Sequence, residues 1–220
     1  KDITEFYPSL NGKYVALISH KKEDKKSTYQ LKVIDPLTNK IELKTKEKTA
    51  INAITFSFNE TAIAFLSSND TTKTKQFELN YGIIKNGKST VILDTASTLL
   101  NSKLGVSENR KLSFSFNDNE LFFGVSDRVK QAPKDSLLES EKAKLDLWSY
   151  TDKRLQPQQL VELKEDKKQT DLYVYHIESK TIHQLSNDSL SVYLPKKLKS
   201  NYLIASNELP YQASYQWDSP

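Results

Sequence analysis

Residues 57–66 read SFNETAIAFL, a short polar turn followed at once by an apolar run. The same pattern occurs as SLNGKYVALI at residues 9–18 and as SFNDNELFFG at residues 115–124, and a weaker copy, LKSNYLIA, covers residues 198–205. In each copy, turn-forming residues such as Asn, Asp or Gly reverse the chain into a strand that we expect to be buried. An internal repeat of this kind predicts an architecture of successive similar units.

Three of these copies are followed by a second unit, which consists of two strands joined by a tight turn. It covers residues 29–43, 77–93 and 171–185. Each cycle then holds about four short strands, and the cycles recur at roughly 50 to 80 residues, a spacing typical of propeller blades. We therefore expect an all-β fold, a β-propeller with about four four-stranded antiparallel blades that form part of a seven- or eight-bladed propeller.

The third cycle is longer than the others because it contains an insertion at residues 127–170. The best helix signal in the chain lies there, as DSLLESEKAK at residues 135–144, where an Asp or Ser is placed to cap a run of good helix formers. Helical periodicity is nearly absent elsewhere. We expect residues 1–220 to form a single, partial propeller domain with this insertion within the third blade.

Residues 82–89, GIIKNGKS, match the G-x-x-x-x-G-K-[ST] pattern of phosphate-binding loops. Such a loop needs a helix after it, because amides at the N-terminus of the helix meet the phosphates. The residues that follow Lys88 read STVIL, and three of the five are β-branched, which favours a strand. Asn86 and Gly87 both tolerate positive φ, so the pair between apolar runs predicts a hairpin turn. The sequence disfavours a nucleotide site here.

Composition excludes several other kinds of site. The chain has 220 residues and no cysteine, so it has no disulfide, zinc-finger thiolate or thiol nucleophile. The net charge is +4, and the lysines are spread along the chain rather than interleaved with aromatic residues, so we expect no nucleic-acid partner. No apolar run approaches the roughly 18 residues that span a bilayer, so we expect no membrane span.

No catalytic residue, metal ligand or cofactor site is predicted. Neither Gly105 nor Gly124 begins a G-x-S-x-G elbow, because each is followed by Val-Ser without the second glycine. His176 and His183 flank a short turn and are placed to face each other across a hairpin, and His20 stands alone. Two histidines are too few for a metal site. Acidic residues are plentiful, but nothing selects a pair of them for glycoside hydrolysis.

Aromatic residues near the insertion and the end of the chain form one further candidate. They are suited either to a binding surface or to the core of a blade, and the sequence leaves both interpretations open. The residues are Trp148, Tyr150, Tyr211, Tyr215 and Trp217.

The turn-plus-strand units SLNGKYVALIS, SFNETAIAFLS and SFNDNELFFGVS resemble the repeat of TolB-like and prolyl oligopeptidase-type propellers. A more specific stretch is LDLWSYTDKRLQPQQ at residues 145–159. It resembles a segment in the propellers of Bacteroidetes serine peptidases of the prolyl oligopeptidase family, where a D-x-W-x-W/Y-x-D-x-x-L-Q-x-x-Q pattern precedes a blade strand. The repeat resemblance covers nearly the whole chain, whereas the specific one covers this segment alone.

This resemblance implies a non-catalytic N-terminal propeller region of a serine peptidase. In the family, the propeller narrows access of short peptide substrates to the active site and docks an α/β-hydrolase domain that carries Ser, Asp and His. That domain is absent from this sequence, so no catalytic residue carries over. The resemblance also implies a periplasmic or cell-envelope location. The alternative is a stand-alone TolB-like propeller that binds a protein or another ligand in the cell envelope.

Four blades without a closing blade would leave an open sheet edge, which is prone to pair with other strands. We therefore expect this edge to be covered, either by further chain or by a partner chain.

Overall fold

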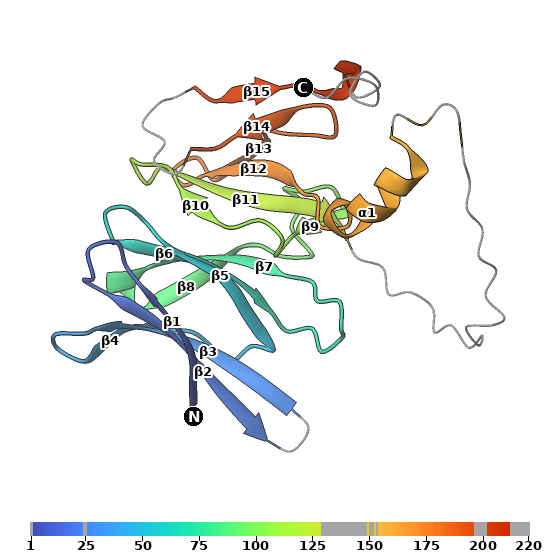
Figure 1. Cartoon of the computed structure of the whole chain (residues 1–220). Helices are drawn as coiled ribbons and strands as arrows, with labels where there is room; N and C mark the ends of the chain where they lie inside the picture. The colour runs from blue at the N-terminus through green and yellow to red at the C-terminus, as the bar shows by residue number, and fades with distance from the viewer. Residues whose placement is uncertain are drawn as a thin grey trace.

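The computed structural model describes residues 2–23, 26–128, 149, 152, 154–195 and 202–211. Its strands form antiparallel sheets that follow one another in chain order from bottom to top of Figure 1. The first sheet contains β1 (Asp2–Pro8), β2 (Val15–Glu23), β3 (Lys26–Asp35) and β4 (Lys40–Lys44). The second contains β5 (Ala50–Phe56), β6 (Ala62–Ser68), β7 (Glu78–Ile83) and β8 (Lys88–Leu93).

The third sheet is built from five strands, and a two-stranded sheet follows it. The five are β9 (Leu104–Val106), β10 (Ser113–Phe114), β11 (Glu120–Asp127), β12 (Asp171–His176) and β13 (Thr181–Gln184). The last pair is β14 (Ser191–Tyr193) and β15 (Ile204–Ser206), with the short 3-10 helix η2 (Leu209–Tyr211) after it. Both β9 and β10 pair with β11, so together they form one interrupted first strand.

The repeat predicted from the sequence is confirmed, and so is the all-β propeller fold. The three strong turn-plus-strand copies become β2, β6 and β11, and the three hairpin units become β3–β4, β7–β8 and β12–β13. The weak fourth copy is described only in part, by β15. The number of blades stays a prediction.

The strand β6 shows how the sheets stack. Ile63 and Phe65 pack in the buried cluster shared with the first sheet, whereas Ala64 and Leu66 pack in the cluster shared with the third sheet. All four side chains are at most 1% exposed. A strand buried on both faces needs a continuous apolar run, which explains why AIAFL lacks polar alternation.

The first sheet carries the same residue pattern on a face that is only partly covered. Val15 and Leu17 hold the positions of Ile63 and Phe65 in the repeat, yet they are only half-buried. Phe6 lies opposite Leu17 in the ladder between β1 and β2 and is 71% exposed. The first sheet therefore presents an apolar face whose equivalent in the second sheet is fully buried.

Acidic side chains connect the turns of the second and third repeats to the turn of the sheet before each of them. Glu60, the fourth residue of the turn SFNE, accepts a hydrogen bond from the amide of Asn11, which lies 2.7 Å from its Oε1. Asp118 holds the same position in SFND and accepts from the amides of Phe58 at 2.6 Å and Asn59 at 2.8 Å. We call these two carboxylate–amide contacts the turn clasps.

The turn clasps depend on an unusual backbone conformation. Glu60 and Asp118 have φ of 53° and 59°, and Gly12, at the equivalent position of the first sheet, has φ of 75°. Left-handed backbone costs a non-glycine residue about 1–2 kcal/mol. Hydrogen bonds to a charged acceptor contribute about 1.5–3 kcal/mol, enough to offset that cost. Because Gly12 has no side chain, the first sheet offers no carboxylate to a sheet before it.

The segment GIIKNGKS forms the hairpin between β7 and β8. The turn contains the 3-10 helix η1 (Ile84–Asn86) and Gly87 with φ of 69°. The residues after Lys88 form β8, so no helix N-terminus is present for a phosphate. The hairpin prediction is confirmed, although Asn86 is in a 3-10 turn rather than at positive φ. A Cβ at Gly82 would lie 2.9 Å from Leu43, which explains the first glycine of the pattern by close packing.

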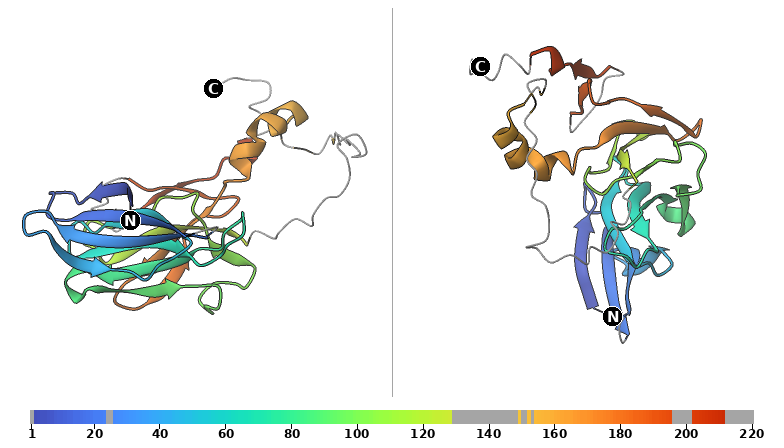
Figure 2. Two further views of the ribbon diagram at one scale, coloured as in Figure 1. Left: turned by 90° about the horizontal axis from the view of Figure 1, so that it is seen from below. Right: turned by 90° about the vertical axis from the view of Figure 1, so that its right-hand side faces the viewer.

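The insertion between β11 and β12 contains a helix that the sequence analysis did not predict. This helix, α1 (Gln156–Asp166), projects beside the third sheet in Figures 1 and 2 and buries none of its residues. The guanidinium of Arg154 forms ion pairs with two carboxylates of this helix, with Glu162 at 2.5 Å and with Asp166 at 2.8 Å. Pro157 in its first turn was the available signal in the sequence for this helix.

The predicted helix at 135–144 lies outside the described residues. Neither α1 nor the 3-10 segments could cross a membrane.

The turn clasp of Glu60 should make stability depend on pH. Burial alone would raise the pKa of Glu60, but hydrogen bonds from Ser9 and Asn11 and the charge of Lys13 outweigh it and lower that pKa below 4.5. A lowered folded-state pKa means that the carboxylate stabilises the fold above the unfolded pKa and stops doing so as pH falls through the folded pKa.

We expect Glu60→Gln to lower the free energy of unfolding by about 1 kcal/mol at pH 7, because a neutral acceptor bonds the amide more weakly. The difference from the wild type should shrink below pH 4.5, as measured by urea unfolding at a series of pH values. Glu178→Gln, in the exposed turn after β12, is the matched control and should change little. A difference between Glu60→Gln and wild type that is constant with pH would contradict the role given to the charge.

Candidate binding site on the first strands

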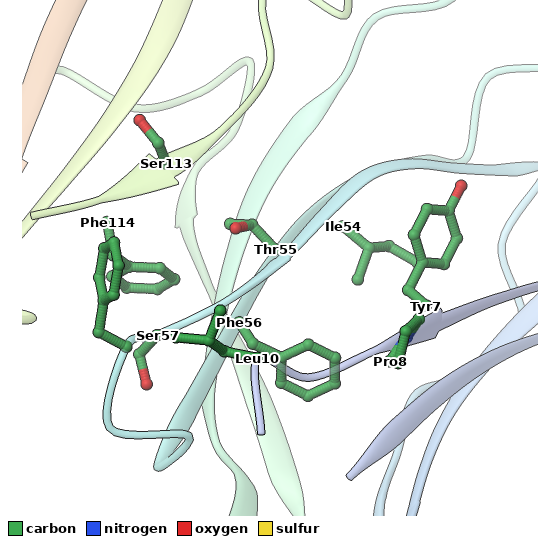
Figure 3. Close-up of a pocket in the computed structure, with 10 residues that line it drawn as sticks. Tyr7, Pro8, Leu10, Ile54, Thr55, Phe56, Ser57, Ser113 and Phe114 are labelled. Atoms are coloured by element: carbon green, nitrogen blue, oxygen red, sulfur yellow. The ribbon is translucent and has the colours of Figure 1, made fainter. Parts of the chain in front are cut away.

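The first strands of three successive sheets converge on one pocket. Its volume is about 410 Å³, and its walls come from β1, β5 and β10 together with the turns that follow β1 and β5 (Figure 3). The lining residues are Tyr7, Pro8, Leu10, Ile54, Thr55, Phe56, Ser57, Phe58, Ser113 and Phe114. Pockets of this size, apolar with a few placed polar groups, are the usual form of sites for small ligands.

Two of these first strands are irregular just before the residues that line the pocket. The ladder between β5 and β6 shifts register between Asn52 and Thr55, and Ala53 inside that shift has φ of 52°. The ladder between β1 and β2 shifts between Ile3 and Glu5. Bulges re-aim side chains and are frequent next to binding sites. The second strands, which pack between sheets, contain no residue at positive φ in the described part.

The chemistry of the pocket is mainly apolar. Phe114 is almost fully buried and packs against Tyr81, with ring centroids 6.3 Å apart. Phe58 packs against Phe116 at 5.5 Å. These tilted ring pairs are favourable arrangements for aromatic side chains. Together they give the pocket an aromatic wall that a ring or an aliphatic side chain of a ligand can pack against.

Three hydroxyl groups interrupt the apolar lining. The Oγ of Ser57 accepts hydrogen bonds from the amides of Thr61 at 3.1 Å and Ala62 at 3.0 Å, so it holds the turn before β6. The hydroxyls of Thr55 and Ser113 make no hydrogen bond within the part of the chain that the structure describes. These two groups are therefore placed to bond a polar atom of a ligand, such as a peptide amide.

Tyr7 contributes a fixed phenol at the rim. Its hydroxyl donates to Oε2 of Glu5 at 2.5 Å. The hydrogen bond to Glu5, followed by burial and the charge of Glu5, raises the pKa of Tyr7 to about 12. The phenol therefore stays protonated at neutral pH, and its proton is committed to Glu5.

The lining of the pocket contains no pair suited to nucleophilic catalysis. Such a pair needs a base within hydrogen-bond reach of the nucleophile, and no histidine lines this pocket. His20 stacks on Tyr29 with ring centroids 4.9 Å apart, and His176 meets His183 edge to face at 5.4 Å. The prediction that the latter two face each other is confirmed. No group of three or more metal-binding side chains gathers in the described ranges.

None of the pocket residues was singled out from the sequence. Of the aromatic candidates, Tyr211 lies in η2 and is 59% exposed, away from the pocket lining. Trp148, Tyr150, Tyr215 and Trp217 fall outside the described residues. The available signal was weak, because the pocket is assembled from strands more than forty residues apart in the sequence, such as β1 and β5.

Comparisons with known proteins bear on the fold alone. No protein-family model matches the chain, and no curated protein matches it significantly in sequence. The structure is similar to dipeptidyl peptidase 4 of Porphyromonas gingivalis, with a TM-score of 0.52 and 12% identity over 94% of this chain and 30% of that one. At this identity the likeness supports the propeller fold, and not the activity.

Two further similarities are weaker. The β-propeller domain of the Trilobed protease from Pyrococcus furiosus gives a TM-score of 0.49 at 13% identity, over 89% of this chain and 47% of that one. TolB from Acinetobacter baumannii gives 0.42 at 10% identity, over 94% of this chain and 41% of that one. The chain thus spans less than half the length of each of these three structures.

Proposed function

We propose that this chain is the N-terminal propeller region of a serine peptidase of the prolyl oligopeptidase type. In this role it docks an α/β-hydrolase domain and controls which peptides reach it. The observation that carries the proposal is the pocket on the first strands, whose described lining offers an aromatic wall and the hydroxyls of Thr55 and Ser113 to a ligand. The likeness in fold to dipeptidyl peptidase 4 supports it, as does the segment at residues 145–159.

The apolar face of the first sheet supports the propeller part of the proposal, in which a further β-sheet covers the first. Val15 and Leu17 repeat the positions at which Ile63 and Phe65 are buried by a preceding sheet. Burial of apolar surface contributes about 25 cal/mol per Å², so leaving such a face in water is costly. The face is suited to a further β-sheet of the same protein or of a partner chain. A periplasmic or cell-envelope location belongs to the same proposal.

The pocket supports the gating part. A peptide that passes along the first strands meets an aromatic wall and the hydroxyls of Thr55 and Ser113, which make no hydrogen bond with the described residues. The wall favours an apolar side chain, and the hydroxyls are suited to the amides of its backbone. Selection would then act on the side chain that the pocket holds, before the peptide reaches the hydrolase.

A labelling experiment separates this proposal from a stand-alone binding module. An antibody raised against residues 1–220 should precipitate, from the cells that make the protein, a polypeptide that reacts with a fluorophosphonate probe of active serines. Heat-denatured extract is the control and should not react. Precipitation of a polypeptide that binds the antibody and never takes the probe would reject the peptidase and favour a TolB-like binding module.

A substitution that fills the pocket tests whether the pocket binds an apolar side chain of a peptide. We expect the phenylalanine ring of acetyl-Ala-Phe-Ala-amide to show saturation-transfer NMR signals with the wild-type chain, and acetyl-Ala-Ala-Ala-amide to show much weaker ones. Thr55→Phe should abolish the ring signal, because the new side chain occupies the space. Thr90→Phe places the same change on the outer strand β8 and should leave the signal intact. Equal signals in all three proteins would show that the peptide binds elsewhere.

A further inference from the structure

A second cavity lies between the third sheet and the strand pair β14–β15, and its lining is polar. Its volume is about 460 Å³. It is bounded by the loop at residues 107–112, by the segment that leads from α1 into β12, and by residues 186–192. None of its lining residues belongs to the pocket on the first strands.

Arg110 enters this cavity from the loop that interrupts the first strand of the third sheet. Its Nε donates to Oγ1 of Thr170 at 2.9 Å, and its Nη2 donates to the carbonyl oxygen of Thr170 at 3.0 Å. Both acceptors are neutral. No carboxylate of the described residues forms an ion pair with the guanidinium, and Nη1 has no protein acceptor there.

The backbone beneath Arg110 is shaped to admit it. A Cβ at Gly124, on β11, would lie 2.5 Å from the Cβ of Arg110, closer than real Cβ contacts allow. The amide of Ser107 donates to the carbonyl oxygen of Gly124 at 2.9 Å, which anchors the same loop. The glycine therefore lets the loop lie flat on β11 and fixes where the guanidinium points.

The charges around Arg110 favour an anion. Lys111 and Lys168 line the cavity with it, against a single lining carboxylate, that of Asp171. Burial lowers the pKa of Arg110, and the nearby charge of Asp171 opposes that shift. Burial and then the charge of Asp188 raise the pKa of Asp171, and the charge of Arg110 opposes them. Asp171 is thus close enough to be felt but forms no ion pair with the guanidinium among the described residues, so a counter-anion bonded directly to Arg110 can still stabilise its charge.

We propose that this cavity binds the carboxylate of a small ligand or of a peptide end, with the guanidinium of Arg110 as its anchor. The guanidinium carries a permanent positive charge, and its Nη1 is the group left to donate a charge-assisted hydrogen bond to a carboxylate oxygen. Lys111 adds attraction without fixing geometry, and Lys168 adds less because its ammonium is paired with Glu165 at 3.3 Å. The negative charges of Asp171 and Asp188 disfavour a doubly charged ligand, so a carboxylate is preferred to phosphate. This site stands on its own residues and does not depend on the proposed peptidase role.

Isothermal titration with three probes tests the assignment. Acetyl-glycylglycine should bind saturably, its amide should not bind, and inorganic phosphate should bind more weakly than the carboxylate. Affinity should fall as salt is raised, because the attraction is screened. Absence of saturable binding of acetyl-glycylglycine, equal binding of the amide, or tighter binding of phosphate would each overturn the proposal.

Substitutions locate the binding. Arg110→Gln should weaken binding of acetyl-glycylglycine by about tenfold, since the positive charge and the charge-assisted hydrogen bond from Nη1 are both lost. Gly124→Ala keeps the charge but displaces Arg110, and it should weaken binding as well. Arg128→Gln is the matched control: its Nε and Nη2 also donate to backbone oxygens, of Leu104 and Thr95, both at 2.8 Å, and it does not line the cavity. Its affinity should equal that of the wild type.

Two exposed positions keep the test valid if the buried variants fail to fold. Lys111→Gln and Lys168→Gln change solvent-exposed side chains and should leave the fold intact. Lys111→Gln should weaken binding by about two- to threefold and reduce its salt dependence, because one positive charge is removed, and Lys168→Gln should do so to a smaller extent because Glu165 already pairs with that lysine. Unchanged affinity in both lysine variants would overturn the proposal.

Discussion

The arrangement of the sheets depends on two carboxylates that reach from one turn to the turn before it. Glu60 bonds the first repeat, and Asp118 bonds the second. The buried clusters hold neighbouring sheets together, but apolar contacts have little direction. The hydrogen bonds of the turn clasps do have direction, so they determine which turns lie next to each other. The first strands β1, β5 and β10 end at these turns. The positions of the turns therefore also determine the pocket between those strands.

The sequence predicted what is local and repeated. The run AIAFL identified a buried strand, and GIIKNGKS was assigned to a hairpin because β-branched residues follow Lys88. The sequence did not predict the turn clasps, because Glu60 and Asn11 become neighbours only when the sheets stack. The helix α1 was not predicted either, because it buries no apolar stripe and Pro157 in its first turn was its one sequence signal.

Both proposed sites arise where the first strands depart from regular pairing. The shift around Ala53 shapes the apolar pocket, and the loop at residues 107–112 delivers Arg110 to the polar cavity. A hydrogen bond of 2.6 Å from Asn52 Nδ2 to Oε2 of Glu108 joins the two irregular segments. The regular strands, by contrast, are occupied with packing between sheets. The fold thus separates residues that hold the stack from residues that are free to meet a ligand.

Amide hydrogen exchange at Phe58 and Asn59, followed by NMR, tests the central role of the turn clasps most directly. Both amides lie in a surface turn and would exchange quickly without an acceptor. The account predicts that, after correction for intrinsic rates, they exchange at least about tenfold more slowly than the amide of Leu10. Leu10 holds the position of Phe58 in the first repeat, and its amide has no acceptor in the described part of the chain. Equal exchange rates at Phe58, Asn59 and Leu10 would contradict the account.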